Sequence, residues 1–122
     1  MDSNKFVTIA LWMIEIRGYV DDRGGERFGR WFAELDPHAA AKVTIAIARL
    51  AQGNFSNVKS VGAGVYEYKI DFGPGYRIYF AKDGDWLVIL IGGGTKKRQA
   101  KDIAAAKECW TDYKRRKKRE PQ

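Results

Sequence analysis

Charged residues at alternate positions of two neighbouring segments are the part of this sequence best suited to chemistry. Glu67, Lys69 and Asp71 take every second position of the first segment, and Arg77 and Tyr79 do so in the second. Side chains along a strand alternate between its two faces, so each set lies on one face. A carboxylate beside cations can accept a proton, and the planar guanidinium of arginine binds phosphate well. These residue types favour proton transfer next to a bound anion.

The length of the turn after Phe72 decides which side chains of the two segments meet, because the strand period is two. A two-residue turn would place Ile70 opposite Arg77 and so mix apolar with charged side chains. We therefore expect a three-residue turn, Gly73–Gly75, which keeps the two faces apart. The register then pairs Asp71 with Arg77, Lys69 with Tyr79, Glu67 with Ala81, Ile70 with Ile78 and Tyr68 with Phe80. Glu67 is the carboxylate of this face with no cation opposite it, and so the better proton acceptor.

The third segment of this sheet is the apolar run Trp86–Ile91, which is typical of a strand covered on both faces. Asp83-Gly84 predicts a tight type I′ turn before it, and Gly92–Gly94 is expected to end it. This turn would place Val88 opposite Tyr79 and Leu90 opposite Arg77. The polar face has a second interpretation, a solvated sheet surface on which Asp71 and Arg77 form an ordinary cross-strand ion pair.

Two helices joined by almost no loop are predicted before this sheet. The first has apolar residues at helical spacing after Asp21 and Asp22, which are suitable N-terminal caps. The second begins at Pro37 with Asp36 as its cap, and Gly53 closes it. The apolar positions are Phe28, Trp31, Phe32 and Leu35 in the first helix and Val43, Ile47 and Leu50 in the second.

The remaining segments complete an α+β fold. Short strands are expected at Met13–Arg17 and near Val58–Val61, and a last helix capped by Thr95 has apolar residues at helical spacing as far as Tyr113. We therefore expect a helical hairpin and a C-terminal helix packed on a small, twisted, mainly antiparallel sheet. The residues expected in its core are Tyr68, Ile70, Ile78, Phe80, Leu87 and Ile89.

Length and charge limit the organisation of the chain. Its 122 residues are enough for one domain, and its net charge is +7. The segment Lys96–Arg119 holds eleven basic and three acidic residues, a local balance of +8. Such a basic end favours a polyanion or an acidic protein as partner, or it is a solubilising tail. We divide the chain into an N-terminal extension 1–12, a domain 13–113 and a basic C-terminal tail 114–122.

Several classes of protein are excluded by what the sequence lacks. The lone Cys109 leaves no intramolecular disulfide, and the single His38 leaves no histidine-based metal site or Ser-His-Asp triad. We therefore expect neither a cofactor nor a metal. No apolar run approaches the roughly 18 residues of a membrane span, and no signal peptide is recognised, so we expect a cytoplasmic protein without a membrane partner.

A longer pattern of residues is similar to that of a known family. It consists of Arg49–Phe55, Lys59, Gly64–Glu67, Ile70–Phe80, Gly92-Gly93, Lys96, Gln99, Asp102 and Ile103. Together these residues resemble the phage Gp49-like, HigB-type branch of the RelE/ParE toxin superfamily, over roughly Met13 to Tyr113. The resemblance implies the toxin of a type II toxin–antitoxin system, commonly a ribosome-dependent mRNA endonuclease. It also implies a cognate antitoxin, often a helix-turn-helix protein encoded by a neighbouring gene.

The resemblance assigns roles to the polar face. RNA can be cleaved without metal or histidine when its 2′-OH attacks the adjacent phosphate, which needs a proton acceptor, a proton donor and cations. Arg77 takes the place of a phosphate-binding arginine in related toxins, and Lys96 that of a basic residue. The expected catalytic residues are Glu67, Lys69, Arg77 and Lys96. The expected RNA-binding residues are Lys59, Tyr79, Trp86, Lys97 and Arg98, with Tyr79 or Trp86 stacking an unpaired base.

Two other functions stay open on the sequence. The same superfamily includes inhibitors of DNA gyrase that lack nuclease residues. A third interpretation is an RNA-binding domain of the same fold that is not toxic. The grouping of Glu67, Lys69, Arg77 and Lys96 favours cleavage over both.

Overall fold

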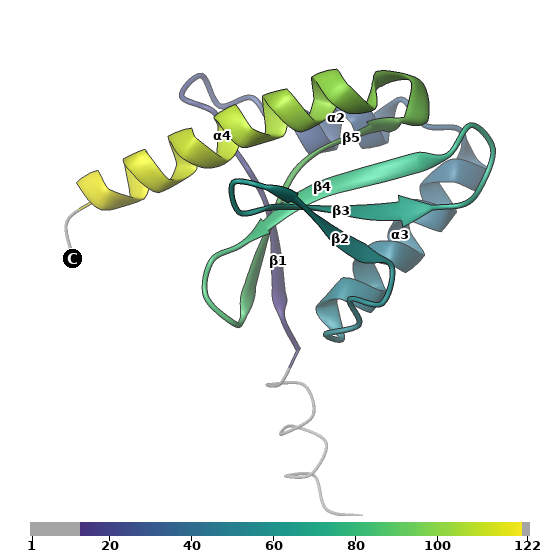
Figure 1. Ribbon diagram of the computed structural model, residues 1–122, viewed down its shortest axis with the longest axis horizontal. Coiled ribbons are helices and arrows are strands. Elements are labelled where there is room, and N and C mark those ends of the chain that lie inside the picture. Colours follow the sequence, from purple (N-terminus) through teal and green to yellow (C-terminus); the bar gives the residue numbers. More distant parts are fainter. Residues whose placement is uncertain (1–12, 121–122) are drawn as a thin grey trace, which may run out of the picture.

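The computed structural model describes residues 13–120, which form a five-stranded mixed sheet with helices on both faces (Figure 1). The strands are β1 (Glu15–Gly18), β2 (Val58–Gly62), β3 (Val65–Ile70), β4 (Tyr76–Lys82) and β5 (Leu87–Thr95). The helices are α2 (Arg27–Ala33), α3 (Pro37–Ala51), the short 3-10 helix η1 (Lys96–Arg98) and α4 (Gln99–Arg119). The strand order is β1-β5-β4-β3-β2, with β1 parallel to β5 and the other pairs antiparallel. The predicted α+β class is confirmed, while the proposed extension 1–12 lies outside the described residues.

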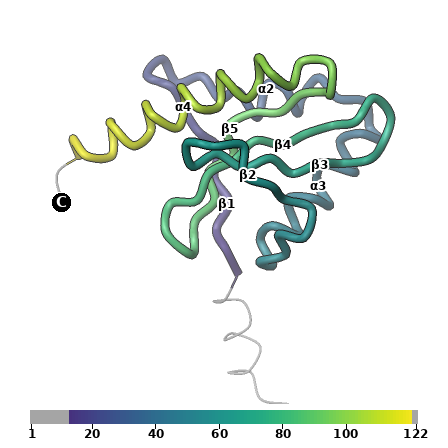
Figure 2. The backbone as a smooth tube through the Cα atoms, in the orientation of Figure 1, coloured from purple at the N-terminus to yellow at the C-terminus, as the bar shows by residue number. Residues whose placement is uncertain are grey.

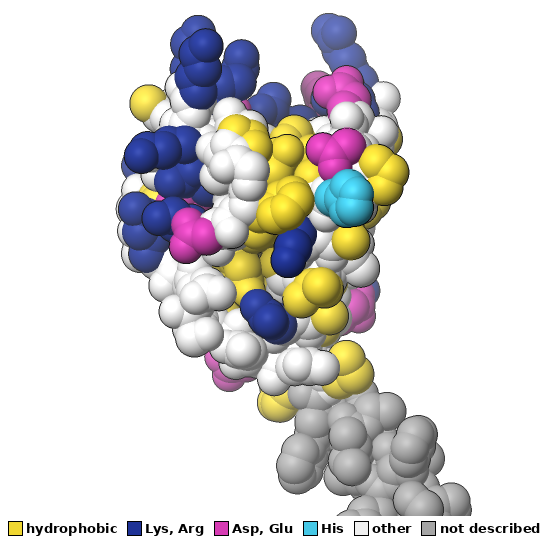
Figure 3. Space-filling model, turned by 90° about the vertical axis from the view of Figure 1, so that its right-hand side faces the viewer, with side chains coloured by type: hydrophobic (Ala, Val, Ile, Leu, Met, Phe, Trp, Pro, Cys, Tyr) yellow, Lys and Arg dark blue, Asp and Glu magenta, His cyan; other side chains and the backbone are white. Residues whose placement is uncertain are grey.

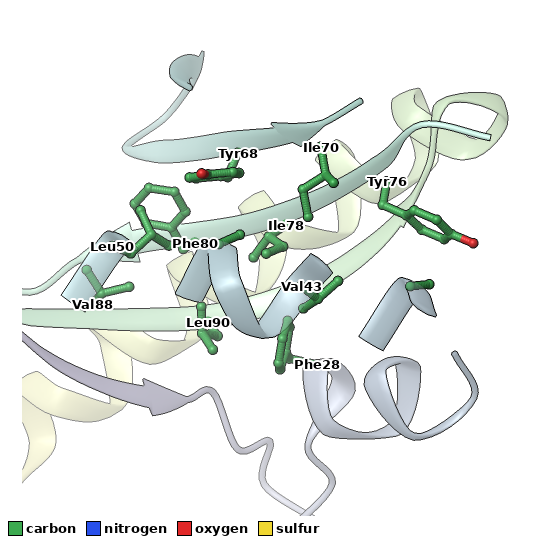
Figure 4. Packing of buried hydrophobic residues seen from close by; sticks show 12 residues of the cluster. Phe28, Val43, Leu50, Tyr68, Ile70, Tyr76, Ile78, Phe80, Val88 and Leu90 are labelled. Atoms are coloured by element: carbon green, nitrogen blue, oxygen red, sulfur yellow. The ribbon is translucent and has the colours of Figure 1, made fainter. Parts of the chain in front are cut away.

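The two helices before the sheet cover one of its faces. Asp36 caps α3 as predicted, because its carboxylate accepts a hydrogen bond of 2.9 Å from the backbone N–H of Ala39. The predicted caps of α2 were wrong. The carboxylate of Asp21 instead accepts from the backbone N–H groups of Arg23 and Gly25, so it closes a loop and α2 begins only at Arg27. Figure 4 shows the resulting core between α2, α3 and the sheet, with Phe28, Val43, Leu50, Tyr68, Ile70, Ile78, Phe80, Val88 and Leu90 among its labelled members.

The other face of the sheet is covered by α4, which runs along the side opposite α3 (Figure 2). Ala106 and Trp110 of α4 pack on Tyr79, Ile89 and Ile91. The interpretation of this face as a solvated surface was therefore wrong. The last turns of α4 include the basic residues after Tyr113, so the expected tail is helical as far as Arg119.

The β3–β4 hairpin has the predicted faces but a different register. Glu67 lies opposite Tyr79, Lys69 opposite Arg77 and Ile70 opposite Tyr76, which makes the connection the five residues 71–75 rather than three. The longer loop forms because Gly73 and Gly75 adopt positive φ angles and the N–H of Gly75 bonds back to the carbonyl of Phe72 at 3.0 Å. The error is two residues, one full strand period, so every side chain keeps its face. Asp71 consequently leaves the strand, and the expected Asp71–Arg77 pair does not form.

The β4–β5 hairpin differs more. Asp83-Gly84 does not make a two-residue turn, because the N–H of Asp83 bonds to the carbonyl of Leu87 and Lys82 lies opposite Val88. Phe80 then pairs with Leu90, and an irregularity shifts the register so that Tyr79 pairs with Gly92. Val88 and Leu90 thus face α3, not the polar side. Of the six residues expected in the core, Leu87 is only partly buried and the other five are buried.

The three glycines do not end β5, which continues through them to Thr95. A Cβ atom at Gly93 would collide with the ring of Trp31 in α2, and one at Gly94 would collide with the carboxylate of Asp102 in α4. The missing side chains therefore let helices on both faces approach the strand. The prediction of a break was wrong because glycine here serves close packing instead of a turn.

Gly93→Ala should destabilise the fold by about 1–3 kcal/mol, since the added methyl group has to displace a partly buried tryptophan. Gly92→Ala is the matched control in the same strand, because the nearest atom to its new methyl, Arg27 Nε, is 3.9 Å away. We expect the control to change stability by about 1 kcal/mol or less. Urea denaturation of both variants measures the difference, and equal losses would show that close approach of Trp31 is not the reason for glycine.

Candidate functional site

Glu67 is the centre of a cluster of charged and polar side chains between the sheet and the start of α4. Its carboxylate is buried, with the whole residue 1% exposed. Arg77 Nε and Lys59 Nζ both lie 3.6 Å from Glu67 Oε1, and Gln99 Nε2 donates a hydrogen bond of 2.9 Å to Glu67 Oε2. Three elements, β2, β4 and α4, therefore each supply one partner to a carboxylate on β3.

Arg77 connects this carboxylate to Lys96. The arginine is 5% exposed, and its Nη1 donates to the carbonyl oxygen of Gly75 at 3.2 Å. The backbone N–H of Lys96 donates to the same oxygen at 3.0 Å. The loop after β3 and the end of β5 are thus tied together beside Arg77, and the exposed side chain of Lys96 begins at that point.

Four buried polar atoms around this cluster have no hydrogen-bond partner among the described residues. They are Glu67 Oε1, Arg77 Nε, Tyr79 Oη and Asp102 Oδ2. Burial, reinforced by the negative charge of Glu67, raises the pKa of Tyr79, and burial raises the pKa of Asp102 against the opposing charges of Arg98 and Arg27. Nearly all buried polar groups of a protein are satisfied, and a grouping of unsatisfied atoms with perturbed pKa values is typical of a functional site.

The predicted catalytic residues are only partly brought together. Glu67 and Arg77 are in contact, and Lys96 adjoins Arg77 through Gly75. Lys69 is exposed on the same strand as Glu67, but its Nζ lies 3.5 Å from Asp71 Oδ1. Arg77 therefore pairs with Glu67 and not with Asp71, contrary to the expected register. Asp71 pairs with Lys69 instead.

The predicted RNA-binding residues are scattered. Lys59 belongs to the cluster, whereas Tyr79 is 1% exposed and offers no ring face to a base. Trp86 is 61% exposed but lies in the turn after β4, whose last residue, Lys82, is about 17 Å from Arg77 along the strand. The side chains of Lys97 and Arg98 are exposed on η1, and Arg98 Nε is 3.9 Å from Asp102 Oδ1.

Gln99 and Asp102 were not predicted as site residues. They stand three positions apart at the start of α4, so they share one face of the helix, and this face lies on the sheet. Both belong to the residue pattern that follows Lys96, and this spacing is the signal that could have identified them.

The charge of the site suits an anion. The Glu67 carboxylate lies beside two cations, Arg77 and the exposed Lys59, and the exposed Lys96 adjoins Arg77 through Gly75. Arginine binds phosphate oxygens with its planar fork, and lysine as a point charge. Within residues 13–120, no three His, Cys, Asp or Glu side chains are grouped so that they could hold a metal ion, and none of the helices is long and apolar enough to cross a membrane.

Comparison with known proteins gives two matches. A family model described as "Phage derived protein Gp49-like" matches residues 30–111, which include β2 to β5 and the first half of α4. A protein of Haemophilus influenzae, described as an uncharacterized protein, is 46% identical over 81 residues. The aligned region covers 66% of this chain and 82% of that protein.

Arg77→Ala should reduce the stability of the fold by about 3–5 kcal/mol, because it removes the buried partner of a buried carboxylate. In a Glu67→Gln background the same substitution should cost less, since no buried charge is left unpaired. A double-mutant cycle by urea denaturation measures this coupling, expected at about 0.5–3 kcal/mol. Lys59→Ala is the exposed control, at about 1 kcal/mol or less. Additive losses from Glu67 and Arg77 would contradict the pairing.

Proposed function

Because the chain belongs to the family of phage-derived Gp49-like proteins, we propose that it is the toxin of a type II toxin–antitoxin pair and acts by cleaving mRNA on the ribosome. The family is part of the RelE-like toxin superfamily, which supports the toxin role. The observation that supports cleavage is the contact between Glu67 and Arg77, flanked by the exposed Lys59 and Lys96.

The proposed reaction is attack of a ribose 2′-oxygen on the adjacent phosphorus. The new O2′–P bond forms as the P–O5′ bond breaks, giving a 2′,3′-cyclic phosphate and a 5′-hydroxyl end. Glu67 accepts the proton of the 2′-OH, and Lys96 or Lys69 returns a proton to the leaving 5′-oxygen. Arg77 stabilises the charge that develops on the phosphate oxygens.

Access to Glu67 involves Gln99. The amide of Gln99 holds Glu67 Oε2 and leaves Oε1, which has no hydrogen-bond partner among the described residues, as the oxygen that accepts the proton. The exposed lysines bind the phosphate first, because they need no rearrangement. In this proposal the buried pair acts on a strand that Lys59 and Lys96 already hold.

A second candidate function is a non-nucleolytic inhibitor of DNA gyrase. The observation that favours it is the burial of Glu67 and Arg77, which are 1% and 5% exposed. In that case the pair is structural and the exposed lysines bind a protein. The two functions differ in whether RNA ends appear when the protein is produced.

Production of this chain alone should arrest growth, and co-production of the protein encoded by the neighbouring gene should relieve the arrest. Mapping of mRNA ends after induction should show new 5′-hydroxyl ends within coding regions, because the proposed reaction leaves that group. Growth arrest without new ends would favour the gyrase-directed function. Normal growth at high soluble expression would favour an RNA-binding domain that is not toxic.

Arg77→Lys tests the catalytic role without removing the buried charge. It should retain part of the cleavage activity and lose less than the about hundred- to thousandfold that removal of a charge-stabilising donor costs, since lysine keeps the charge and loses only the bidentate contact to phosphate. Arg17→Lys is the matched control, an arginine in β1 that pairs with Glu15 on the exposed surface. Cleavage of a defined mRNA is measured beside the urea midpoint of each variant. A loss of rate that follows only the loss of stability would contradict a catalytic Arg77.

A further inference from the structure

We propose that an open groove between α3 and the β2 edge of the sheet binds a single-stranded segment of RNA by its phosphates. The inference rests on the proposed action on RNA and concerns residues beyond the Glu67 cluster. The groove has a volume of about 620 Å³ and is bounded by α3, by the segment that enters β2 and by the end of β3. The lining residues that the argument uses are Lys42, Arg49, Ser56, Asn57, Lys59 and Lys69.

The groove is lined by four basic residues and one acidic residue. The acidic one is Asp71, whose carboxylate already pairs with Lys69. Lys42 and Arg49 are exposed on α3, and no described carboxylate lies within ion-pair distance of either. They stand seven residues apart, so two helical turns, about 10 Å along the axis, separate two cations on the same face. This arrangement suits two phosphates of one strand.

The groove is continuous with the Glu67 cluster. Lys59 lines the groove, and its Nζ also lies 3.6 Å from Glu67 Oε1. Lys59 lies opposite Glu67 in the β2–β3 register, whereas the neighbouring Tyr68 points to the opposite face, towards α3. The groove therefore passes around the edge of the sheet, from the α3 side to the side on which Arg77 contacts Glu67. A strand bound in it has its next phosphates at the cluster.

The lining favours RNA over an acidic protein. Ser56 and Asn57 are exposed polar residues beside the hydroxyl of Tyr68, to which Asn57 Nδ2 donates at 3.4 Å. Such groups suit ribose and base edges, while cations along the backbone hold phosphates. Ile45 is the one exposed large apolar side chain of the lining. Figure 3 shows the side of the molecule on which α3 lies, where Lys and Arg side chains gather along one flank and others stand among apolar ones.

The test uses a short single-stranded RNA whose 2′-hydroxyls are all methylated, so that it binds and is not cleaved. Binding by the full chain is measured by fluorescence anisotropy over a series of salt concentrations. The Lys42→Ala/Arg49→Ala double variant should weaken binding about 25-fold at about 0.1 M salt. The slope of log K against log salt concentration should become shallower by about 1.4, because each of the two lost phosphate contacts contributes about 0.7 for a single strand.

The matched control is Lys114→Ala/Lys118→Ala on α4. It removes the same two charges from an exposed helix surface, and Lys114 covers the ring of Trp110 at 5.6 Å much as Lys42 covers Phe72 at 5.4 Å. We expect this variant to keep the affinity and the salt dependence of the unaltered protein. Equal weakening by both double variants would overturn the groove, since binding would then follow net charge alone.

Two further outcomes separate this proposal from the proposed function. If the groove variant binds RNA normally and no longer binds the protein encoded by the neighbouring gene, the groove is a protein-docking surface and the proposal is wrong. If the groove variant no longer binds RNA while Arg77→Lys leaves cleavage unchanged, the RNA-binding groove is supported and the catalytic assignment of Arg77 fails. The groove positions lie on the exposed face of α3, so circular dichroism should show both double variants folded.

Discussion

The burial of the Glu67 carboxylate is the constraint on which much of this structure depends. A carboxylate taken out of water costs several kcal/mol unless cations and hydrogen-bond donors replace the lost hydration. Here the replacements come from Arg77, Lys59 and Gln99, on three different elements. A different hairpin register, or another start for α4, would leave the charge without them. The carboxylate therefore specifies how β2, β4 and α4 meet around β3 at the same time as it prepares a site for an anion.

The glycines of β5 leave room for the start of α4, which brings Gln99 to the Glu67 carboxylate. The start of α4 reaches Glu67 only if Asp102, one turn further along the helix, can lie against the sheet. A side chain at Gly94 would occupy the place of that carboxylate, while one at Gly93 would push away Trp31 on the opposite face. The inner strand β5 thus lacks side chains where the helices on both faces of the sheet come closest to it. Packing and site geometry are consequently set by the same short segment.

The sequence predicted the fold class and the faces of the β3–β4 hairpin, because both follow from the spacing of apolar residues. It failed where long-range contacts decide. The register error came from Gly73 and Gly75, whose positive φ angles allow a five-residue loop that alternation alone cannot distinguish from three. The polar face was expected to be wet because its own residues do not show that α4 covers it. Of the predicted site residues, Glu67, Arg77 and Lys96 came from alternation and the family pattern, whereas the hydrogen bond from Gln99 to Glu67 follows from how α4 docks on the sheet.

Burial and exposure divide the basic residues of this chain into two groups with different physical roles. Arg77 is fixed by Glu67 and Gly75, so its guanidinium is already oriented when an anion arrives and little reorganisation is needed. Lys42, Arg49 and Lys59 are exposed, and their attraction to phosphates is long-range and weakened by salt. To attract a polyanion from a distance, a cation has to be exposed. To stabilise a developing charge, it has to be buried and fixed in orientation. Both kinds of cation lie on one continuous surface at the β2 edge of the sheet, because Lys59 belongs to the groove and to the Glu67 cluster.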